Sequence, residues 1–116
     1  MPACLFCQIV ARESAADIEY EDDDVLAFRD IYPKAPVHLL IIPKRHVESV
    51  MALAPEDAPL VGRLVLAARR IGEQKGLAER GYRLQIHCGP EGGQLVYHLH
   101  VHFLAGRLAE RRVERR

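Results

Sequence analysis

The chain has 116 residues, of which 49% are hydrophobic, and its 16 Lys and Arg residues balance its 16 Asp and Glu residues. This length fits a single domain with one sizeable core and room for one site. The neutral overall charge argues against nucleic acid or an anionic membrane as a partner, but it is compatible with a local anion site.

The amino-terminal residues lack the features of a secretory signal. Residues 1–4 contain no basic segment followed by an apolar run, and no apolar stretch approaches the about 20 residues that span a bilayer. The three cysteines, Cys4, Cys7 and Cys88, are too few for a disulfide framework. We therefore expect a cytoplasmic protein without a membrane span.

The first part of the chain predicts a short lead and a hairpin. Residues 1–16 have the composition of a short helix or a loop. Residues 18–20 and 25–28 have strand composition on either side of the acidic run 21–24, which predicts two strands joined by a turn. The acidic run offers oxygen ligands for a cation, but we interpret it as a solvated turn.

A loop over residues 30–36 is expected to lead into a largely buried strand. The apolar run from Val37 to Ile42 is broken only by His38 and is ended by Pro43. A single histidine in such a strand is typically a hydrogen-bonded core residue, unless a site recruits it.

Residues 44–76 are helical in character. Pro55, followed by two acidic residues, marks a helix start, and Gly76 after Lys75 marks its end. Apolar residues recur between them at steps of three and four and form one stripe that would lie on a sheet: Leu60, Leu64, Ala68 and Ile71. We interpret this helix as scaffold.

Two further strands are expected at residues 82–88 and 94–104. The loop between them, residues 89–93, reads Gly-Pro-Glu-Gly-Gly. Glycine has no Cβ, so the backbone amides of such a loop can approach an anion. An ordinary turn is the alternative. The arginine-rich residues 107–116 read as a solvated end.

The segment His98-Leu99-His100-Val101-His102-Phe103 is the most informative part of the sequence. In an extended strand the three histidines share one face, with neighbouring Cα atoms roughly 6.5–7 Å apart. Such a row suits a metal or a phosphate, and imidazole also serves as a base or a nucleophile near neutral pH. An exposed polar face, the alternative, has no need of three identical residues.

The pair Cys4 and Cys7 is a candidate half of a zinc site. Tetrahedral structural zinc accepts two thiolates and two imidazoles, and the available imidazoles are those at positions 38, 46 and 87 and in the triplet. Ligation by Cys4, Cys7, His46 and His98 would hold the amino terminus against the sheet. A reduced, metal-free thiol pair remains the alternative.

The remaining histidines suit either catalysis or a second metal. Two histidines two residues apart on a strand can chelate, and His38 could supply a third ligand. A glycine-rich loop beside a neutral imidazole instead favours attack on phosphorus, which proceeds through a phosphoryl- or nucleotidyl-histidine. His100 alone has an imidazole on either side, so it is the better nucleophile, with His102 and His38 contacting the phosphate or the leaving group.

Four blocks of the sequence resemble a known protein family. Residues 92–107, Gly-Gly-Gln-Leu-Val-Tyr-His-Leu-His-Val-His-Phe-Leu-Ala-Gly-Arg, are similar to the signature of the histidine triad (HIT) family, in particular its Hint branch of nucleoside phosphoramidate hydrolases. The similarity extends through residues 4–10, 25–31 and 35–46, in the same order. It therefore covers nearly the whole chain up to residue 107.

The resemblance implies an α+β fold with a five-stranded antiparallel sheet, a long helix and a short N-terminal helix. It also implies a homodimer in which two sheets join into one. On this basis we expect a single domain over residues 1–107, followed by a basic tail at residues 108–116.

The resemblance further implies that His100 attacks the α-phosphorus of a purine nucleotide conjugate, expels an amine or a second phosphate, and is released by water. Three further histidines complete the catalytic set: His38, His98 and His102. The implied nucleotide-binding residues are Asp30, Ile31, His38, His87, Gly93, Gln94, Leu95, His100 and His102. A structural zinc ion is implied at Cys4, Cys7, His46 and His98.

Two departures from the family pattern concern the phosphate site. Leu95 stands where a Ser or Thr usually donates to a phosphate oxygen or leaving group, and His87 stands in place of an Asn. A lost hydrogen bond to a charged oxygen costs roughly 1.5–3 kcal/mol. The residues after 107 also do not match the Hint branch. Two alternatives therefore stay open: a dinucleoside polyphosphate hydrolase or nucleotidyl transferase, and a weakly catalytic, zinc-stabilised nucleotide-binding adaptor.

Overall fold

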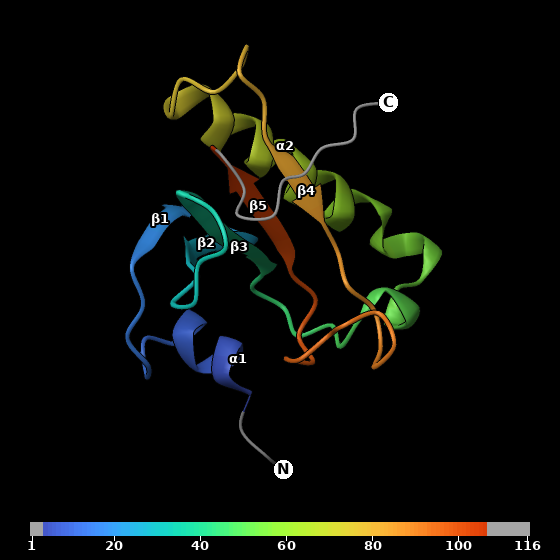
Figure 1. The fold of residues 1–116 in the computed structure, drawn as a ribbon. Coiled ribbons are helices and arrows are strands. Elements are labelled where there is room, and N and C mark those ends of the chain that lie inside the picture. Colours follow the sequence, from blue (N-terminus) through green and yellow to red (C-terminus); the bar gives the residue numbers. More distant parts are fainter. Residues whose placement is uncertain (1–3, 107–116) are drawn as a thin grey trace.

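The computed structural model describes residues 4–106, which form one five-stranded antiparallel sheet flanked by helices (Figure 1). In spatial order the strands are β1 (Ile18–Glu21), β2 (Val25–Arg29), β3 (Val37–Pro43), β5 (Val101–Ala105) and β4 (Arg83–Gln85). The α+β fold expected from the sequence is confirmed. The predicted tail at residues 108–116 lies outside the described residues.

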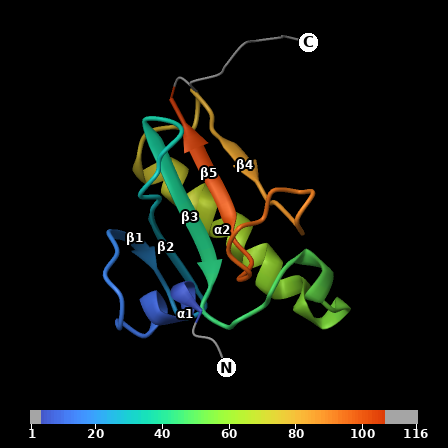
Figure 2. The same ribbon diagram turned by 60° about the horizontal axis from the view of Figure 1, so that its bottom comes forward.

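The helices cover opposite faces of the sheet. Helix α1 (Leu5–Val10) packs on one face, and the long helix α2 (Ala58–Gln74) lies behind β3 and β5 on the other (Figure 2). Two 3-10 helices, Val50–Ala52 and Pro55–Asp57, precede α2. Among the described residues, no helix has both the length and the apolar character that crossing a bilayer requires.

Strands β2 and β3 are apolar on both sides because each side meets a helix. Val25, Ala27, Leu39 and Ile41 belong to the core beneath α2. Leu26, Phe28, Leu40 and Ile42 pack instead with Phe6 and Ile9 of α1. Alternate side chains of a strand point to opposite faces, so covering both faces requires the continuous apolar runs seen in the sequence.

The predicted helical region begins later than its composition suggested. Pro55 opens a 3-10 turn that runs directly into α2, and Gly76 follows the helix with a φ of 70°. The prediction was wrong for residues 44–49, which are not helical. The carbonyls of Val47 and Glu48 accept hydrogen bonds from Leu99 N and Gln94 Nε2, so this backbone is bonded to another segment rather than to a helix of its own.

The last two strands are also shorter than predicted. Residues 82–88 were expected as one strand and 94–104 as the other, but only Arg83–Gln85 and Val101–Ala105 pair. Residues 86–100 form a long loop whose polar groups bond to one another and to the segment after β3. Alternation nevertheless persists, because Leu99, Val101 and Phe103 join the core under α2.

Candidate active site and metal centre

Four histidines from separate segments gather on the face of the sheet that carries α1. His38 lies on β3, His102 on β5, His100 immediately before β5, and His87 in the loop after β4. The centroid of the His102 ring lies 5.2 Å from that of His38, 5.1 Å from that of His100 and 4.7 Å from that of His87. His102 is thus the centre of an imidazole cluster.

The ring of His100 is held in one tautomer. Its Nδ1 lies 2.7 Å from the backbone carbonyl oxygen of His98. A carbonyl oxygen only accepts, so Nδ1 carries the proton and Nε2 keeps its lone pair. Burial is the main cause that lowers the pKa of His100, which keeps the ring neutral. A neutral imidazole with a free Nε2 lone pair is the form that attacks phosphorus.

A chain of hydrogen bonds also assigns the tautomers of His38 and His102. The backbone N–H of Lys34 donates to His38 Nδ1 at 3.0 Å, so the neutral His38 ring carries its proton on Nε2. That Nε2 lies 3.0 Å from His102 Nδ1 and 3.3 Å from an Asp30 carboxylate oxygen. His102 Nδ1 is therefore an acceptor, and the proton of His102 sits on Nε2.

Burial keeps this histidine chain uncharged. It lowers the pKa of His102 to about 4, with smaller contributions from neighbouring His100, His87 and His38. Burial also lowers the pKa of His38, against the opposing attraction of Asp30. Of these three rings, His100 therefore offers a nitrogen lone pair at neutral pH and His102 offers an N–H.

The glycine-rich loop forms a compact turn that uses its own amides. Gly92 N and Gln94 N donate to the Gly89 carbonyl, and Gly93 N donates to that of Pro90. A Cβ at Gly92 would lie 2.3 Å from the Cys88 carbonyl oxygen, so only glycine fits there. The expectation of amides free to cradle a phosphate is not met in this conformation, because these amides already have partners.

Gln94 supports this loop from inside. Its side chain is buried, accepts from Gly89 N at 3.0 Å, and donates to the carbonyls of Glu48 at 2.8 Å and Val96 at 3.0 Å. Leu95, the next residue, is 90% exposed. The sequence analysis predicted that both residues contact the nucleotide. In the structure the Gln94 side chain forms hydrogen bonds that hold the loop, and the Leu95 side chain is an apolar group exposed to solvent.

Asp30 and Ile31 lie at the opposite edge of the cluster. Together with His38 they line a cavity of about 380 Å³ next to β1, the end of β2 and the start of β3. One Asp30 oxygen accepts from Tyr32 N at 2.8 Å, and the other faces His38. The Ile31 side chain is exposed. The site thus combines an acceptor, an apolar contact and imidazoles.

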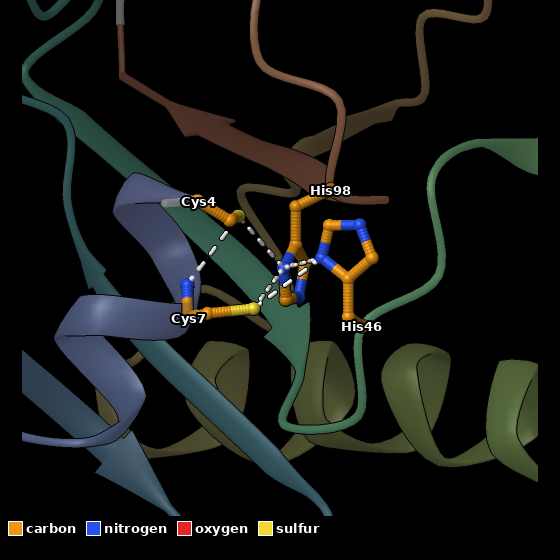
Figure 3. A group of neighbouring side chains, drawn as sticks. All are labelled: Cys4, Cys7, His46 and His98. Carbon is orange, nitrogen blue, oxygen red and sulfur yellow. Dashed lines mark hydrogen bonds between the residues drawn. The ribbon is translucent and has the colours of Figure 1, made fainter. Parts of the chain in front are cut away.

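A second group of side chains has the composition of a zinc site (Figure 3). Cys4 and Cys7 come from the start of α1, His46 from the segment after β3, and His98 from the segment before β5. Their four ligand atoms all lie within 4.8 Å of one another. The sequence prediction placed these same four residues together.

The distances between the ligand atoms fit a tetrahedral metal. Sulfur to nitrogen distances are 3.4 Å for Cys4 and His98 and 3.3 Å for Cys7 and His46, and the two Nδ1 atoms lie 3.2 Å apart. Zinc bonds of about 2.3 Å to sulfur and about 2.0–2.1 Å to nitrogen require edges of about 3.5 Å and about 3.3 Å, respectively. The residues present therefore fit a Cys2His2 zinc ion.

The hydrogen bonds of the histidine rings distinguish the Cys4, Cys7, His46 and His98 group from the cluster of Asp30, His38 and His102. His98 Nε2 donates to the Pro43 carbonyl at 2.8 Å, which leaves the His98 Nδ1 lone pair for a metal. His38 Nε2, by contrast, carries a proton because Nδ1 accepts from Lys34. The Asp30, His38 and His102 side chains therefore form a chain of hydrogen bonds. Because both ring nitrogens of His98 are engaged, its side chain faces the metal group rather than a substrate.

Two contributors to the site were absent from the sequence prediction. Phe6 of α1 packs edge-on against His98 and His100, with ring centroids 5.8 Å and 5.3 Å apart. The Lys34 backbone amide sets the tautomer of His38. Phe6 lies between Cys4 and Cys7 in the sequence, and this position could have indicated its place beside the site. The contribution of a backbone amide cannot be found from residue types.

Comparison with known proteins agrees with this geometry. The family described as scavenger mRNA decapping enzyme C-terminal binding matches residues 3–116. The purine nucleoside phosphoramidase of Escherichia coli is 48% identical over 103 residues, 89% of this chain and 87% of that protein. An uncharacterized HIT-like protein of Synechococcus elongatus is 52% identical over 89% of this chain and 90% of its own length.

Solved structures show the same fold. A HIT family hydrolase of Legionella pneumophila superposes with a TM-score of 0.89 at 45% identity, covering 90% of this chain and 94% of its own. A histidine triad protein of Clostridium difficile gives a TM-score of 0.90 at 37% identity, covering 97% and 100%. The chain belongs to the histidine triad family of hydrolases. Within that family it is a homologue of the Escherichia coli purine nucleoside phosphoramidase.

The lowered histidine pKa values predict that acid destabilises the fold. Histidines in the unfolded chain take up protons near pH 6.5, whereas folded His102 does so only at about pH 4. The unfolded state thus binds more protons in this window, so the free energy of unfolding should rise with pH from about 4 to about 6.5 and then level off. Denaturant titrations across this window measure the slope.

A His102→Asn variant separates this contribution from that of the carboxylates. Asn does not titrate, so the slope above pH 5 should be shallower in the variant than in the native protein. Equal slopes would show that His102 does not contribute.

Proposed function

We propose that this protein hydrolyses purine nucleoside 5′-phosphoramidates and related AMP conjugates through a nucleotidyl-histidine on His100. The observation that carries the proposal is the 2.7 Å hydrogen bond from His100 Nδ1 to the His98 carbonyl, which leaves Nε2 as a lone pair beside the His102 N–H. Homology to a purine nucleoside phosphoramidase supports the choice of substrate.

The reaction proceeds in two displacements at phosphorus. His100 Nε2 forms a bond to the α-phosphorus while the phosphorus–nitrogen bond breaks, and the amine leaves with a proton from water. A second water then adds its oxygen to phosphorus, the bond to Nε2 breaks, and AMP and a proton are released. His102 Nε2–H donates to the phosphate oxygens or the leaving nitrogen, and it stabilises the charge that gathers there.

The remaining assignments place the nucleotide along the imidazole cluster. Asp30 accepts from the ribose, Ile31 contacts the base, and Gly93 lets the phosphate approach. His38 orients His102 by donating to its Nδ1. Gln94 and His98 act by positioning, since the Gln94 side chain holds the loop and His98 holds His100.

His87 supplies the hydrogen bond that Leu95 cannot. A Cβ at Gly93 would lie 3.8 Å from His87 Nδ1, and His87 packs against His102, so its ring borders the phosphate position. His87→Ala should lower kcat by about 10- to 100-fold, whereas His87→Asn, which keeps an N–H donor, should retain most of the activity. Steady-state kinetics of both variants test this expectation. An undiminished kcat in His87→Ala would rule out His87 as the hydrogen-bond donor.

A panel of conjugates tests the proposed function. Release of AMP from an adenosine 5′-phosphoramidate, from a diadenosine tetraphosphate and from an aminoacyl adenylate is compared under the same conditions. Fastest release from the phosphoramidate supports the proposal, and fastest release from the tetraphosphate favours a dinucleoside polyphosphate hydrolase. Tight AMP binding with negligible release throughout would identify a nucleotide-binding adaptor, for which the apolar Leu95 is the supporting observation.

The edge of the sheet supports the expected homodimer. Strand β4 has a neighbour on one side only, and its Leu84 is exposed together with Ile86 just beyond it and Val65 and Leu66 on α2. An unpaired strand edge beside apolar side chains favours pairing with a second copy. Sedimentation should give twice the chain mass of 13.1 kDa, and Leu84→Lys should shift the protein to monomer. A monomeric native protein would contradict the expectation.

We make three further proposals. Cys4, Cys7, His46 and His98 would hold a zinc ion, which would link α1 to the sheet and would not serve as a reactive centre. The single domain extends over residues 1–107. The location is cytoplasmic, since thiolate ligands need a reducing environment.

A further inference from the structure

The metal group and the nucleophile share one residue. His98 directs its side chain to Cys4, Cys7 and His46, while its backbone carbonyl accepts the proton of His100 Nδ1 at 2.7 Å. The His98 side chain is fully buried. Whatever holds the His98 ring therefore also holds the carbonyl that selects the tautomer of His100.

The segment around His98 has few other supports. Residues 86–100 form no helix or strand, so strand pairing does not hold them. Leu99 N donates to the Val47 carbonyl at 2.7 Å, and His98 Nε2 donates to that of Pro43 at 2.8 Å. Both acceptors lie close to His46 in the chain. A metal joining His46 and His98 would therefore add a bonded link between two segments that are otherwise connected by these hydrogen bonds and by the packing of Val47 and Leu99 in the core.

Helix α1 reaches His100 from the same group. The thiol of Cys4 caps the helix by accepting from Cys7 N at 3.5 Å. Phe6, between the two cysteines, contacts the ring of His100 edge-on. A metal in this group would therefore hold two of the structures that touch His100: the carbonyl bonded to its Nδ1 and the aromatic ring packed against it.

We infer that the Cys4–Cys7–His46–His98 metal clamp is a positioning device for the nucleophile, which fixes His98 so that His100 presents Nε2 to the substrate. The inference rests on the proposed role of His100. Loss of the metal frees the His98 segment and lets the neutral His100 ring populate both tautomers. The rate of attack falls, while Asp30, Ile31 and the cavity beside them still bind the nucleotide.

The test combines kinetics with a direct view of the ring. Zinc-loaded protein, chelator-treated protein and a Cys7→Ser variant are compared for kcat, for KM and for metal content. Nitrogen-15 NMR of labelled histidines reports which nitrogen of His100 carries the proton, with His100→Gln identifying the signal. Cys88→Ser is the matched control, since Cys88 is the cysteine outside the clamp.

We expect metal loss to lower kcat by about 100-fold, the usual effect of a displaced reacting group, with KM little changed. The His100 signal should change from the Nδ1–H tautomer to a mixture. Cys7→His keeps a metal-binding side chain and should recover the tautomer and most of kcat.

Three results separate the possible failures. An unchanged His100 tautomer and kcat after metal removal, or absence of metal from the purified protein, would overturn the inference. Lack of turnover by zinc-loaded protein would overturn the proposed function, while the tautomer measurement still tests the clamp. If the metal-free protein unfolds, the comparison moves to zinc-loaded Cys7→Asp, whose carboxylate keeps the metal but changes the geometry of the clamp. An unchanged His100 tautomer and kcat in that variant would then also overturn the inference.

Discussion

Replacing His100 with alanine should abolish hydrolysis of an adenosine phosphoramidate, with a loss of kcat of at least about a thousandfold. The substitution removes the atom that forms the covalent intermediate, and removal of a nucleophile is among the largest single effects in enzymes. Neither His38 nor His102 can take its place. The protons of His38 and His102 lie on Nε2, and His38 Nδ1 accepts from Lys34 while His102 Nδ1 accepts from His38.

Binding measurements distinguish a lost nucleophile from a damaged site. AMP should bind the His100→Ala variant within a few-fold of the native affinity, because Asp30, Ile31 and His102 remain in place. Rapid acid-free quenching and mass spectrometry of the native enzyme should show one nucleotidyl group on the peptide that contains residue 100. Substantial turnover by the variant, or an adduct on another residue, would contradict the assignment.

Phe103→Ala should destabilise the fold by about 3–5 kcal/mol, the usual cost of removing a large aromatic side chain from a packed core. Phe103 is 0% exposed, lies in the core beneath α2, and stacks on Tyr82 with ring centroids 4.5 Å apart and an interplanar angle of 21°. Domains of this size are stable by about 5–15 kcal/mol, so the loss is a large fraction of the total. Urea denaturation of the two proteins measures it.

A matched control is Met51→Ala, since the Met51 side chain is 82% exposed. This variant should differ from the native protein by no more than about 0.5 kcal/mol. A Phe103→Ala protein within 1 kcal/mol of native would mean that the core relaxes around the lost ring. His102 precedes Phe103 directly on β5, so lower activity is also expected at temperatures where the variant begins to unfold.

The sheet could be predicted where local pattern and tertiary environment agree. The apolar runs of β2 and β3 are long because helices cover both faces, and the turn residues between β1 and β2 are acidic and solvated. The predictions failed at residues 44–49, where a helix was expected, and at residues 86–88 and 94–100, where strands were expected. Two hydrogen bonds join these segments, from Leu99 N to the Val47 carbonyl and from Gln94 Nε2 to the Glu48 carbonyl, and no local pattern records such a pairing.

The sequence by itself determined the chemistry of the site: imidazoles that alternate with apolar residues, a thiol pair with two candidate partners, and a glycine-rich turn. These features are local, because residue type and spacing set which groups can bind metal or attack phosphorus. Only the tertiary structure assigned the ring protons of His38, His98, His100 and His102. Whether a ring nitrogen attacks, donates or binds metal depends on the hydrogen bond at the other ring nitrogen, and those partners lie on distant segments or on the backbone: Lys34 N for His38, the His98 carbonyl for His100, and the Pro43 carbonyl for His98.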